Sequence, residues 1–322
     1  MLKWAGGKRQ LLPVLRRYYP IEFGRYLEPF FGSGAVFFDL EASGALAGHP
    51  TVLIDSNADL IGCYETVRDD PGAVAAALDE LAAAHARRGS AHYYEVRDRR
   101  FNPSREAGRR SDGSIAYTPA LAAMLIYLNR TGFNGLFRVN ASGNFNVPAG
   151  RYERPRIADR DRLLKVASAL DRGRVQLRLD SFERVEGLAE PGDFLYIDPP
   201  YAPVSRTANF TGYTSPQFGV EDQVRLQRLA IALARRGCHV LLSNSTAREI
   251  AALYDGNTEA GDAGLRAVKV AARRAINRDA GGRGPVEEFV ITNVEPRALD
   301  AHQPDELATV RTRVRHPQIA VK

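Results

Sequence analysis

The sequence has few cysteines, no long hydrophobic run and no repeat. Cys63 and Cys238 suit neither a disulfide framework nor a metal-ligand spacing, which favours a reducing, intracellular environment. The apolar runs of the chain, such as LAIALA at 229–234, are far shorter than the roughly 20 residues that a bilayer span needs. The stretch MLKWAGGKRQLLPVL does not follow the order of regions in a secretory signal. We therefore expect a cytoplasmic protein rather than a membrane, secreted or solenoid protein.

The chain does contain enough apolar residues for a core, together with an excess of positive charge. Of its 322 residues 44% are hydrophobic, which supports one or two domains. The net charge is +6 and the isoelectric point is about 9.4. Between Arg87 and Arg110 eight arginines stand against three acidic residues, so much of the excess lies in one segment. This balance suits a polyanionic partner, and a solvated helix face explains it equally well.

Strand-like and helix-like segments alternate at both ends of the chain. Seven short apolar segments are typical of buried strands: RYLEPF (25–30), HPTVLID (49–55), RVQLRLD (174–180), GDFLYID (192–198), CHVLLSN (238–244), LRAVKVA (265–271) and EEFVITN (287–293). Helical patterns lie between them at 35–42, 161–170, 220–236 and 247–254. This alternation predicts an α/β fold with a mostly parallel sheet covered on both faces.

The middle of the chain breaks this alternation. It is mostly helical, with patterns at 58–68, 71–88, 92–100 and 118–129, and it closes with GLFRVNASGNFNVPAGRY. There, residues 136–140 and 144–147 are expected to pair across the turn ASG as a β-hairpin. We therefore predict a discontinuous α/β domain at 1–57 and 157–295, a helical insertion with a hairpin at 58–156, and an unpatterned tail at 296–322.

The segment GDFLYIDPPYAP (192–203) joins an apolar strand to an acid, two prolines and a tyrosine. Pro199 and Pro200 lack the N–H group that a sheet needs, so the strand ends near Asp198. The carboxylate and Tyr201 then lie at the carboxyl edge of the sheet, where ligands bind in open α/β folds. Asp198 and the Pro199 carbonyl can both accept hydrogen bonds from one aromatic amino group, and Tyr201 can stack on its ring. The alternative is a strand-ending turn with no further role.

A turn containing two glycines follows the first strand. In YLEPFFGSGAVFF (26–38), Gly32 and Gly34 allow a ligand to approach backbone N–H groups at the start of a helix. Because the third glycine of GxGxxG is absent, the turn is not a dinucleotide signature. Asp55, which ends the next strand, is placed to accept hydrogen bonds from a ribose or, alternatively, to cap the following helix.

The N-terminal segment KWAGGKRQLL contains a Gly-Gly-Lys turn. It is not a phosphate loop, because Arg9 follows Lys8 where Ser or Thr is required. Trp4, the one tryptophan of the chain, lies beside this turn and is expected to face a ligand.

Seven motifs occur in the order LKWAGGKRQLL, YLEPFFGSGAVFF, LIDSNADLI, NRTGFNGLFRVNASGNFNVPAGRY, LYIDPPY, FTGYT and LLSNS, from Leu2 to about Thr292. Together they resemble the Dam-like (D12 class) N6-adenine-specific DNA methyltransferases. The resemblance implies a Rossmann-like S-adenosyl-L-methionine (AdoMet) domain with a helical target-recognition insertion carrying a β-hairpin. It also implies AdoMet as methyl donor, no metal, and double-stranded DNA as the partner of a monomer that is nucleoid-associated when on DNA.

The same resemblance implies which residues act. The AdoMet-contacting positions are Trp4, Lys8, Phe31, Gly32, Gly34, Asp55 and Asp198. The catalytic tetrapeptide is Asp198, Pro199, Pro200 and Tyr201. The positions that meet DNA, on and after the hairpin, are Leu136, Arg138, Pro148, Arg151 and Tyr152, as in relatives acting on GATC-type sites.

The expected reaction is direct transfer of a methyl group from AdoMet to N6 of an adenine flipped out of the duplex. Arg138 is expected to read a guanine edge, and segment 87–110 to meet phosphates. One alternative is methyl transfer to RNA or to another amine or amide, against which the hairpin and the large insertion argue. A second is a DNA-binding regulator that keeps the fold without the activity, against which the intact Asp198 and Tyr201 argue.

Overall fold

Seven strands form one mixed sheet in the computed structural model, which describes residues 1–4, 6–202, 218–273 and 285–298. The strands are β1 (Tyr26–Glu28), β2 (Thr51–Asp55), β3 (Val175–Leu179), β4 (Phe194–Ile197), β5 (His239–Ser245), β6 (Arg266–Arg273) and β7 (Pro285–Thr292). Their order is β3-β2-β1-β4-β5-β7-β6. Neighbours from β3 to β5 are parallel, whereas β7 runs antiparallel to β5 and β6. The predicted α/β, Rossmann-like sheet is confirmed, and each predicted strand segment falls on one strand.

The sheet separates two hydrophobic cores, because successive side chains of a strand point to opposite faces. In β4, Phe194 and Tyr196 enter one core, and Leu195 and Ile197 enter the other. All four are buried, which explains why a strand in the middle of a covered sheet reads as an unbroken apolar run rather than an alternating one.

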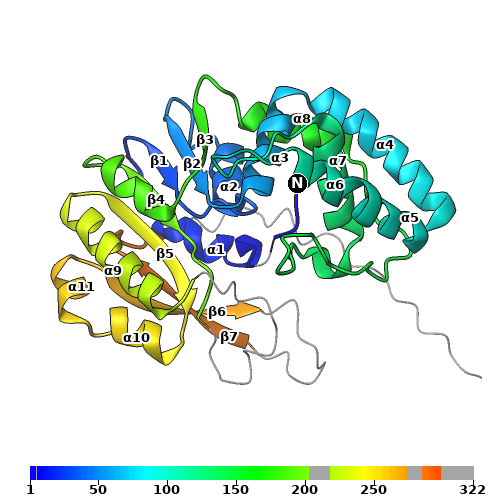
Figure 1. The fold of residues 1–322 in the computed structure, drawn as a ribbon. Helices are drawn as coiled ribbons and strands as arrows, with labels where there is room; N and C mark the ends of the chain where they lie inside the picture. Colours follow the sequence, from blue (N-terminus) through cyan, green and yellow to red (C-terminus); the bar gives the residue numbers. More distant parts are fainter. Residues whose placement is uncertain (5, 203–217, 274–284, 299–322) are drawn as a thin grey trace, which may run out of the picture.

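Helices cover both faces of the sheet (Figure 1). In the α/β part they are α1 (Leu12–Leu15), α2 (Ala35–Ala42), α8 (Arg160–Ala169), α9 (Val220–Arg235), α10 (Arg248–Tyr254) and α11 (Thr258–Asp262). Figure 1 shows α9, α10 and α11, in yellow tones, gathered on one side of the sheet. Within the described ranges, no helix is long and apolar enough to cross a membrane.

The insertion contains α3 (Ala58–Asp69), α4 (Pro71–Arg88), α5 (Ser90–Glu95), α6 (Asn102–Ala107) and α7 (Pro119–Thr131). A π-helical segment, Val96–Phe101, joins α5 to α6. Helix α7 is buried on all sides from Leu121 to Asn129 and packs against α3 and α4. One continuous core links this insertion to a face of the sheet, so the boundaries at 58 and 156 stay a prediction. Of the expected tail, residues 299–322 lie outside the described part of the chain.

The hairpin predicted at the end of the insertion is present. Val139 pairs antiparallel with Phe145, and a second bridge joins Gly132 to Ala149. The turn between the arms is closed by the N–H of Gly143, which donates to the carbonyl of Asn140 at 2.8 Å. Gly143 has a φ of +76°, a left-handed conformation that glycine adopts without steric cost. The predicted pairing of the two arms is therefore confirmed for 138–140 with 144–146.

Candidate active site

The order in which the chain adds strands to the sheet reverses between β1 and β4. Strand β1 lies between β2 and β4, so the chain continues to one side from β1 to β3 and to the other from β4 to β5. Ligands bind at the carboxyl ends of the strands beside such a switch point. The glycine turn after β1 and Asp198 after β4 both lie there, as predicted.

Asp198 is half-buried at the end of β4, where the two prolines stop the strand. The Nζ atom of Lys8 lies 2.8 Å from its Oδ1 atom, with the two side chains 6% and 19% exposed respectively. The same Nζ donates to the carbonyl of Gly6 at 2.7 Å and lies 4.2 Å from the centre of the Tyr201 ring. Burial raises the pKa of Asp198 to about 6, while the positive charge of Lys8 acts in the opposite direction. Lys8, Asp198 and Tyr201 thus form one cluster.

Polar side chains from other elements hold the segment after Asp198. Gln223, in the first turn of α9, donates from Nε2 to the carbonyl of Pro200 at 3.0 Å and accepts from Nδ2 of Asn244 at 3.0 Å. Ser245 Oγ donates to the carbonyl of Ala202 at 2.9 Å. Sequence reasoning assigned none of these three supporting residues a role, although two of them lie at the end of the LLSNS strand.

Tyr201 is tied to the antiparallel strand β7. Its hydroxyl donates to Oε2 of Glu288 at 2.8 Å. Burial raises the pKa of the Tyr201 hydroxyl, and the nearby carboxylates of Asp198 and Glu288 raise it further. Sequence reasoning missed Glu288, because an acid within a strand carries no motif, and only the pairing of β7 with β5 brings it to the site.

The glycine turn is fastened to β2 by Asp55. The N–H of Gly32 donates to Oδ2 of Asp55 at 2.9 Å, and the N–H of Asn57 donates to Oδ1 at 2.9 Å. The cap of α3 is Asn57, whose side chain accepts from the N–H of Leu60 at 3.0 Å. The alternative that Asp55 itself caps this helix is therefore wrong. Burial raises the pKa of Asp55 to about 6, against the two N–H groups that lower it.

Backbone conformation and close contacts favour glycine at both positions of the turn. Gly32 has a φ of +48°, and a Cβ atom there would lie 3.1 Å from Cδ1 of Trp4. Gly34 has a φ of +64°, and a Cβ atom there would lie 2.4 Å from the Phe31 ring. Phe31 is itself 1% exposed, so its side chain supports the turn from the core, and its backbone N–H and carbonyl bond Ile54 and Gly34 at 2.9 and 2.7 Å.

The hairpin that carries residues expected to meet DNA contacts the N-terminal segment of this site. The Nε atom of Arg138 donates to Oδ1 of Asn146 at 2.8 Å across the two arms. Leu136 is half-buried, and the remaining three, Pro148, Arg151 and Tyr152, are exposed. Within the hairpin, Phe137 stacks on Trp4 with ring centres 5.5 Å apart, so a candidate AdoMet residue touches the hairpin directly.

Asn129, at the end of α7, joins the N-terminal segment to the start of the hairpin. Its Oδ1 accepts from the N–H of Lys3 at 2.7 Å, and its Nδ2 donates to the carbonyls of Lys3 and Gly135 at 2.8 Å each. Sequence reasoning placed this asparagine in a motif but gave it no role.

The arginines of segment 87–110 differ in how far their side chains are exposed. Six of its arginines are exposed: Arg87, Arg88, Arg99, Arg100, Arg109 and Arg110. Arg105 is 7% exposed and pairs with Asp59, its Nε atom 2.6 Å from Oδ1. The prediction that this segment meets phosphates is therefore wrong for Arg105, and it stays a prediction for the exposed arginines.

Comparison with known proteins agrees with this arrangement. A family model described as D12 class N6 adenine-specific DNA methyltransferase matches residues 4–276. The chain is 37% identical over 297 residues to Type II methyltransferase M1.LlaDCHI of Lactococcus lactis subsp. cremoris, covering 90% of this chain and 94% of that protein. It is 35% identical over 289 residues to Type II methyltransferase M.MjaIII of Methanocaldococcus jannaschii, covering 86% and 92%. It is 34% identical over 289 residues to the DNA adenine methylase of Escherichia coli K12, covering 90% and 93%. The chain belongs to the D12 class N6 adenine-specific DNA methyltransferase family.

Proposed function

We propose that this protein is a site-specific DNA adenine N6-methyltransferase that uses AdoMet and acts on an adenine flipped out of the duplex. One observation carries the proposal: a carboxylate, a backbone carbonyl and an aromatic ring meet where β4 ends, next to the glycine turn after β1. Among the described residues, the carbonyls of Pro200 and Ala202 are hydrogen-bonded, whereas the Pro199 carbonyl beside Asp198 has no such bond.

These groups suit the chemistry of an exocyclic amino group. The lone pair of adenine N6 is delocalised into the ring, which makes the nitrogen a poor nucleophile. Hydrogen bonds from its two N–H groups to Asp198 and to the Pro199 carbonyl favour a more tetrahedral nitrogen with a localised lone pair. Asp198 is also the nearest base for the proton that the amino group must lose. Tyr201, held by Glu288, provides the face on which the extruded ring stacks.

The residues at the glycine turn fit AdoMet, which supplies an electrophilic methyl group when bound. Helix α2 (Ala35–Ala42) has no side-chain cap at Gly34, so the N–H groups of Ala35 and Val36 are the ones that its end can offer to a ligand, while that of Phe37 bonds Glu28. We assign cofactor contacts to Trp4, Lys8, Phe31, Gly32, Gly34, Asp55 and Asp198. That no metal takes part stays a prediction.

Double-stranded DNA with a GATC-like site is the proposed substrate, supported by the match of the hairpin residues to the family pattern. Flipping an adenine costs a few kcal/mol, which stacking on Tyr201 and the bonds to Asp198 and Pro199 help to offset. The test is incubation with methyl-labelled AdoMet and, separately, duplex DNA, RNA or protein. Label in N6-methyladenine of duplex DNA is the expected result. Label only in RNA or protein contradicts the proposal, and DNA binding without any label identifies an inactive DNA-binding relative.

Replacing Arg138 with alanine is expected to relax sequence preference rather than weaken all DNA binding equally. A bidentate contact between Arg and guanine is worth about 1–3 kcal/mol of discrimination. Methylation of duplexes with one altered base pair should therefore approach that of the preferred site. The exposed Arg99 serves as the control, because a phosphate contact there carries no sequence information. An equal loss on all duplexes in the Arg138 variant argues against base recognition.

The rate of methylation is expected to fall below a pH of about 6. Because burial raises the pKa of Asp198 to about 6, protonation removes its negative charge and its ability to act as a base as the pH falls through that value, and kcat/KM then drops about tenfold per pH unit. Lys8 lowers this pKa, so Lys8→Gln should move the loss to higher pH at saturating AdoMet. Asp55→Asn is the control, because Asp55 also has a pKa of about 6. Removing the Asp55 carboxylate should leave the fall of kcat/KM at low pH in place. A shift to lower pH in the Lys8 variant refutes the assignment.

A further inference from the structure

The return arm of the hairpin has two hydrogen-bonding edges. On one edge it pairs with the outgoing arm, where Asn140 N–H donates to the carbonyl of Asn144 at 2.9 Å and Asn146 N–H donates to that of Arg138 at 3.1 Å. On the other edge the backbone of Gly143, Phe145 and Val147 is bonded by side chains of the α5–α6 helical segment. These side chains take the place that a third strand has in a sheet.

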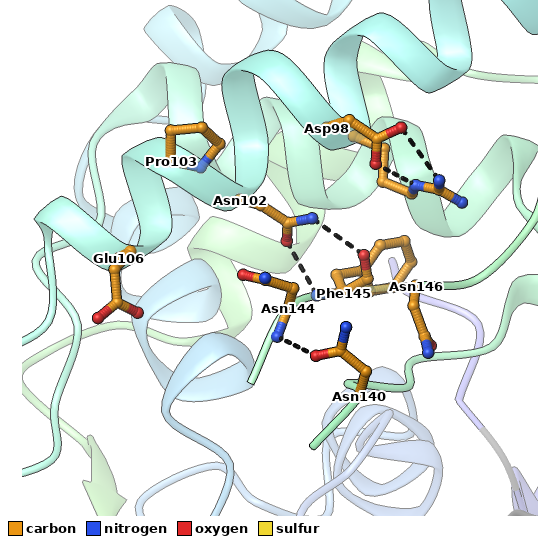
Figure 2. A pocket seen from close by; sticks show the side chains of 9 residues that line it. Asp98, Asn102, Pro103, Glu106, Asn140, Asn144, Phe145 and Asn146 are labelled. Carbon is orange, nitrogen blue, oxygen red and sulfur yellow. Dashed lines mark hydrogen bonds and ion pairs between the residues drawn. The ribbon is translucent and has the colours of Figure 1, made fainter. Parts of the chain in front are cut away.

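Asn102 makes the most complete of these contacts. Its Nδ2 donates to the carbonyl of Phe145 at 3.0 Å, and its Oδ1 accepts from the N–H of Phe145 at 2.9 Å. Figure 2 shows both bonds, with Asn102 reaching from its helix to the hairpin backbone. A carboxamide that bonds both groups of one residue reproduces what a paired strand residue does, and it therefore fixes the position of Phe145 in two directions.

Three further side chains continue this edge. Arg105 Nη1 donates to the carbonyl of Gly143 at the turn. At the other end the carbonyl of Val147 accepts from the Tyr93 hydroxyl at 2.9 Å and from Arg97 Nη1 at 3.0 Å. The bonded positions on the hairpin are thus every second residue, as the two-residue period of an extended arm requires.

The π-helical segment places these four side chains on one face. Their spacing is four, five and three residues from Tyr93 to Arg105, and the five-residue step begins inside Val96–Phe101 and ends at Asn102, the residue after it. Pro103 has no N–H group and cannot continue the regular α-helical ladder, which accounts for the wider turn before it. Without that turn, Asn102 and Arg105 would rotate away from the hairpin.

A buried ion pair anchors this face to the rest of the molecule. Arg105 is paired with Asp59, whose Oδ1 also accepts from the Tyr117 hydroxyl at 2.8 Å. Asp59 is 2% exposed and lies in the first turn of α3, four residues after Asp55. The turn of the hairpin is therefore held in a fixed relation to the cofactor-binding edge of the sheet.

The position of Phe145 affects the residue proposed to read DNA. Its neighbour Asn146 accepts from Arg138 Nε, so the place of the return arm sets the orientation of the Arg138 guanidinium. Beside these contacts lies an open hollow of about 450 Å³, lined by Asn102, Glu106 and three hairpin asparagines, Asn140, Asn144 and Asn146 (Figure 2). The hairpin has room to tilt into this hollow if Asn102 releases it.

We propose that Asn102, supported by the buried Arg105, is a positioning residue for sequence recognition: it holds the return arm where Arg138 meets its base, without itself touching DNA. The inference rests on the proposed function of the hairpin.

The test uses a pool of duplexes in which the bases around a single adenine are randomised, with methylated positions read by sequencing. Such a pool contains every candidate target sequence. Asn102→Ala should reduce the preference for the best sequence over its single-base variants about tenfold, mainly through a higher KM on the best sequence. Asn102→Asp should do the same although its shape is unchanged, because the carboxylate cannot donate to the Phe145 carbonyl. We prefer Asn102 to Arg105 for this test, since removing Arg105 leaves Asp59 buried and unpaired.

Two controls separate positioning from folding and from phosphate contacts. AdoMet affinity, followed by the fluorescence of Trp4, and the thermal midpoint report whether the fold is kept. Asn102→Ser replaces the alanine variant if that variant does not fold. Arg100→Ala alters an exposed arginine of the same segment and should leave the ranking of sequences unchanged. A lower kcat on all sequences with an unchanged ranking in the Asn102 variants overturns the proposal. A wild-type protein that methylates no duplex overturns the proposed function instead.

Discussion

Replacing Asp198 with alanine is expected to lower kcat for methyl transfer by about 10²–10³-fold while duplex DNA still binds. This is the size of loss seen when one preorganised group that acts mainly in the transition state is removed. The Pro199 carbonyl alone then accepts from the amino group, and no carboxylate is left to take its proton. DNA affinity should hold, because the residues proposed to contact the duplex lie on and after the hairpin. Single-turnover methylation and a separate DNA-binding titration measure the two effects.

Asp198→Asn is the matched variant for this experiment. An amide of the same shape keeps one acceptor oxygen but loses the charge and the base, so its activity should lie between that of the wild type and that of the alanine variant. It also leaves Lys8, whose side chain is 6% exposed, beside a neutral partner, so the thermal midpoint should be recorded for both. Wild-type kcat in the alanine variant, or DNA binding lost together with activity, contradicts the assigned role.

Replacing Gly34 with alanine is expected to lower the free energy of unfolding by about 2–5 kcal/mol and to abolish AdoMet binding. A residue with a side chain pays about 1–2 kcal/mol for the left-handed conformation at a φ of +64°. The added Cβ atom would also lie 2.4 Å from the Phe31 ring, and overpacking of this kind costs about 1–3 kcal/mol. The turn and its N–H groups must then shift away from Asp55. Chemical denaturation and the fluorescence of Trp4 follow the two effects.

Gly44 is the control for the conformational part of that loss. Its φ is +77°, and a Cβ atom there meets nothing within 4 Å. Gly44→Ala should therefore cost only the conformational 1–2 kcal/mol or so and leave AdoMet binding intact. Equal destabilisation by the two substitutions would show that the contact with Phe31 is relieved by side-chain movement and is not what requires glycine at position 34.

Local patterns in the sequence were enough to predict the sheet and the place of the candidate site at its edge. A β-strand is recognisable because its apolar run and its stop signal are contiguous, and in 192–203 both lie within a few residues. The glycine turn and the hairpin are equally local, since each depends on the conformation of two or three neighbouring residues. The family motifs then assigned roles to residues such as Asp198 and Arg138, roles that stay predictions until they are tested by substitution.

Only the tertiary structure decided which polar residues support these parts. Asn129 bonds Lys3 across 126 residues of sequence, Glu288 reaches Tyr201 across 87, and Arg105 reaches Asp59 across 46. Asp55 and Asn57 both lie just before α3 in the sequence, yet only Asn57 caps the helix. Asp55 bonds the glycine turn instead, because β1 and β2 are neighbours in the sheet. A single polar residue in a helix or strand carries no periodic signal, and its partner is set by how the elements pack. The sequence by itself therefore determined which segments form the sheet, the turn and the hairpin. Tertiary packing decided which buried hydrogen bonds hold these parts in place relative to one another.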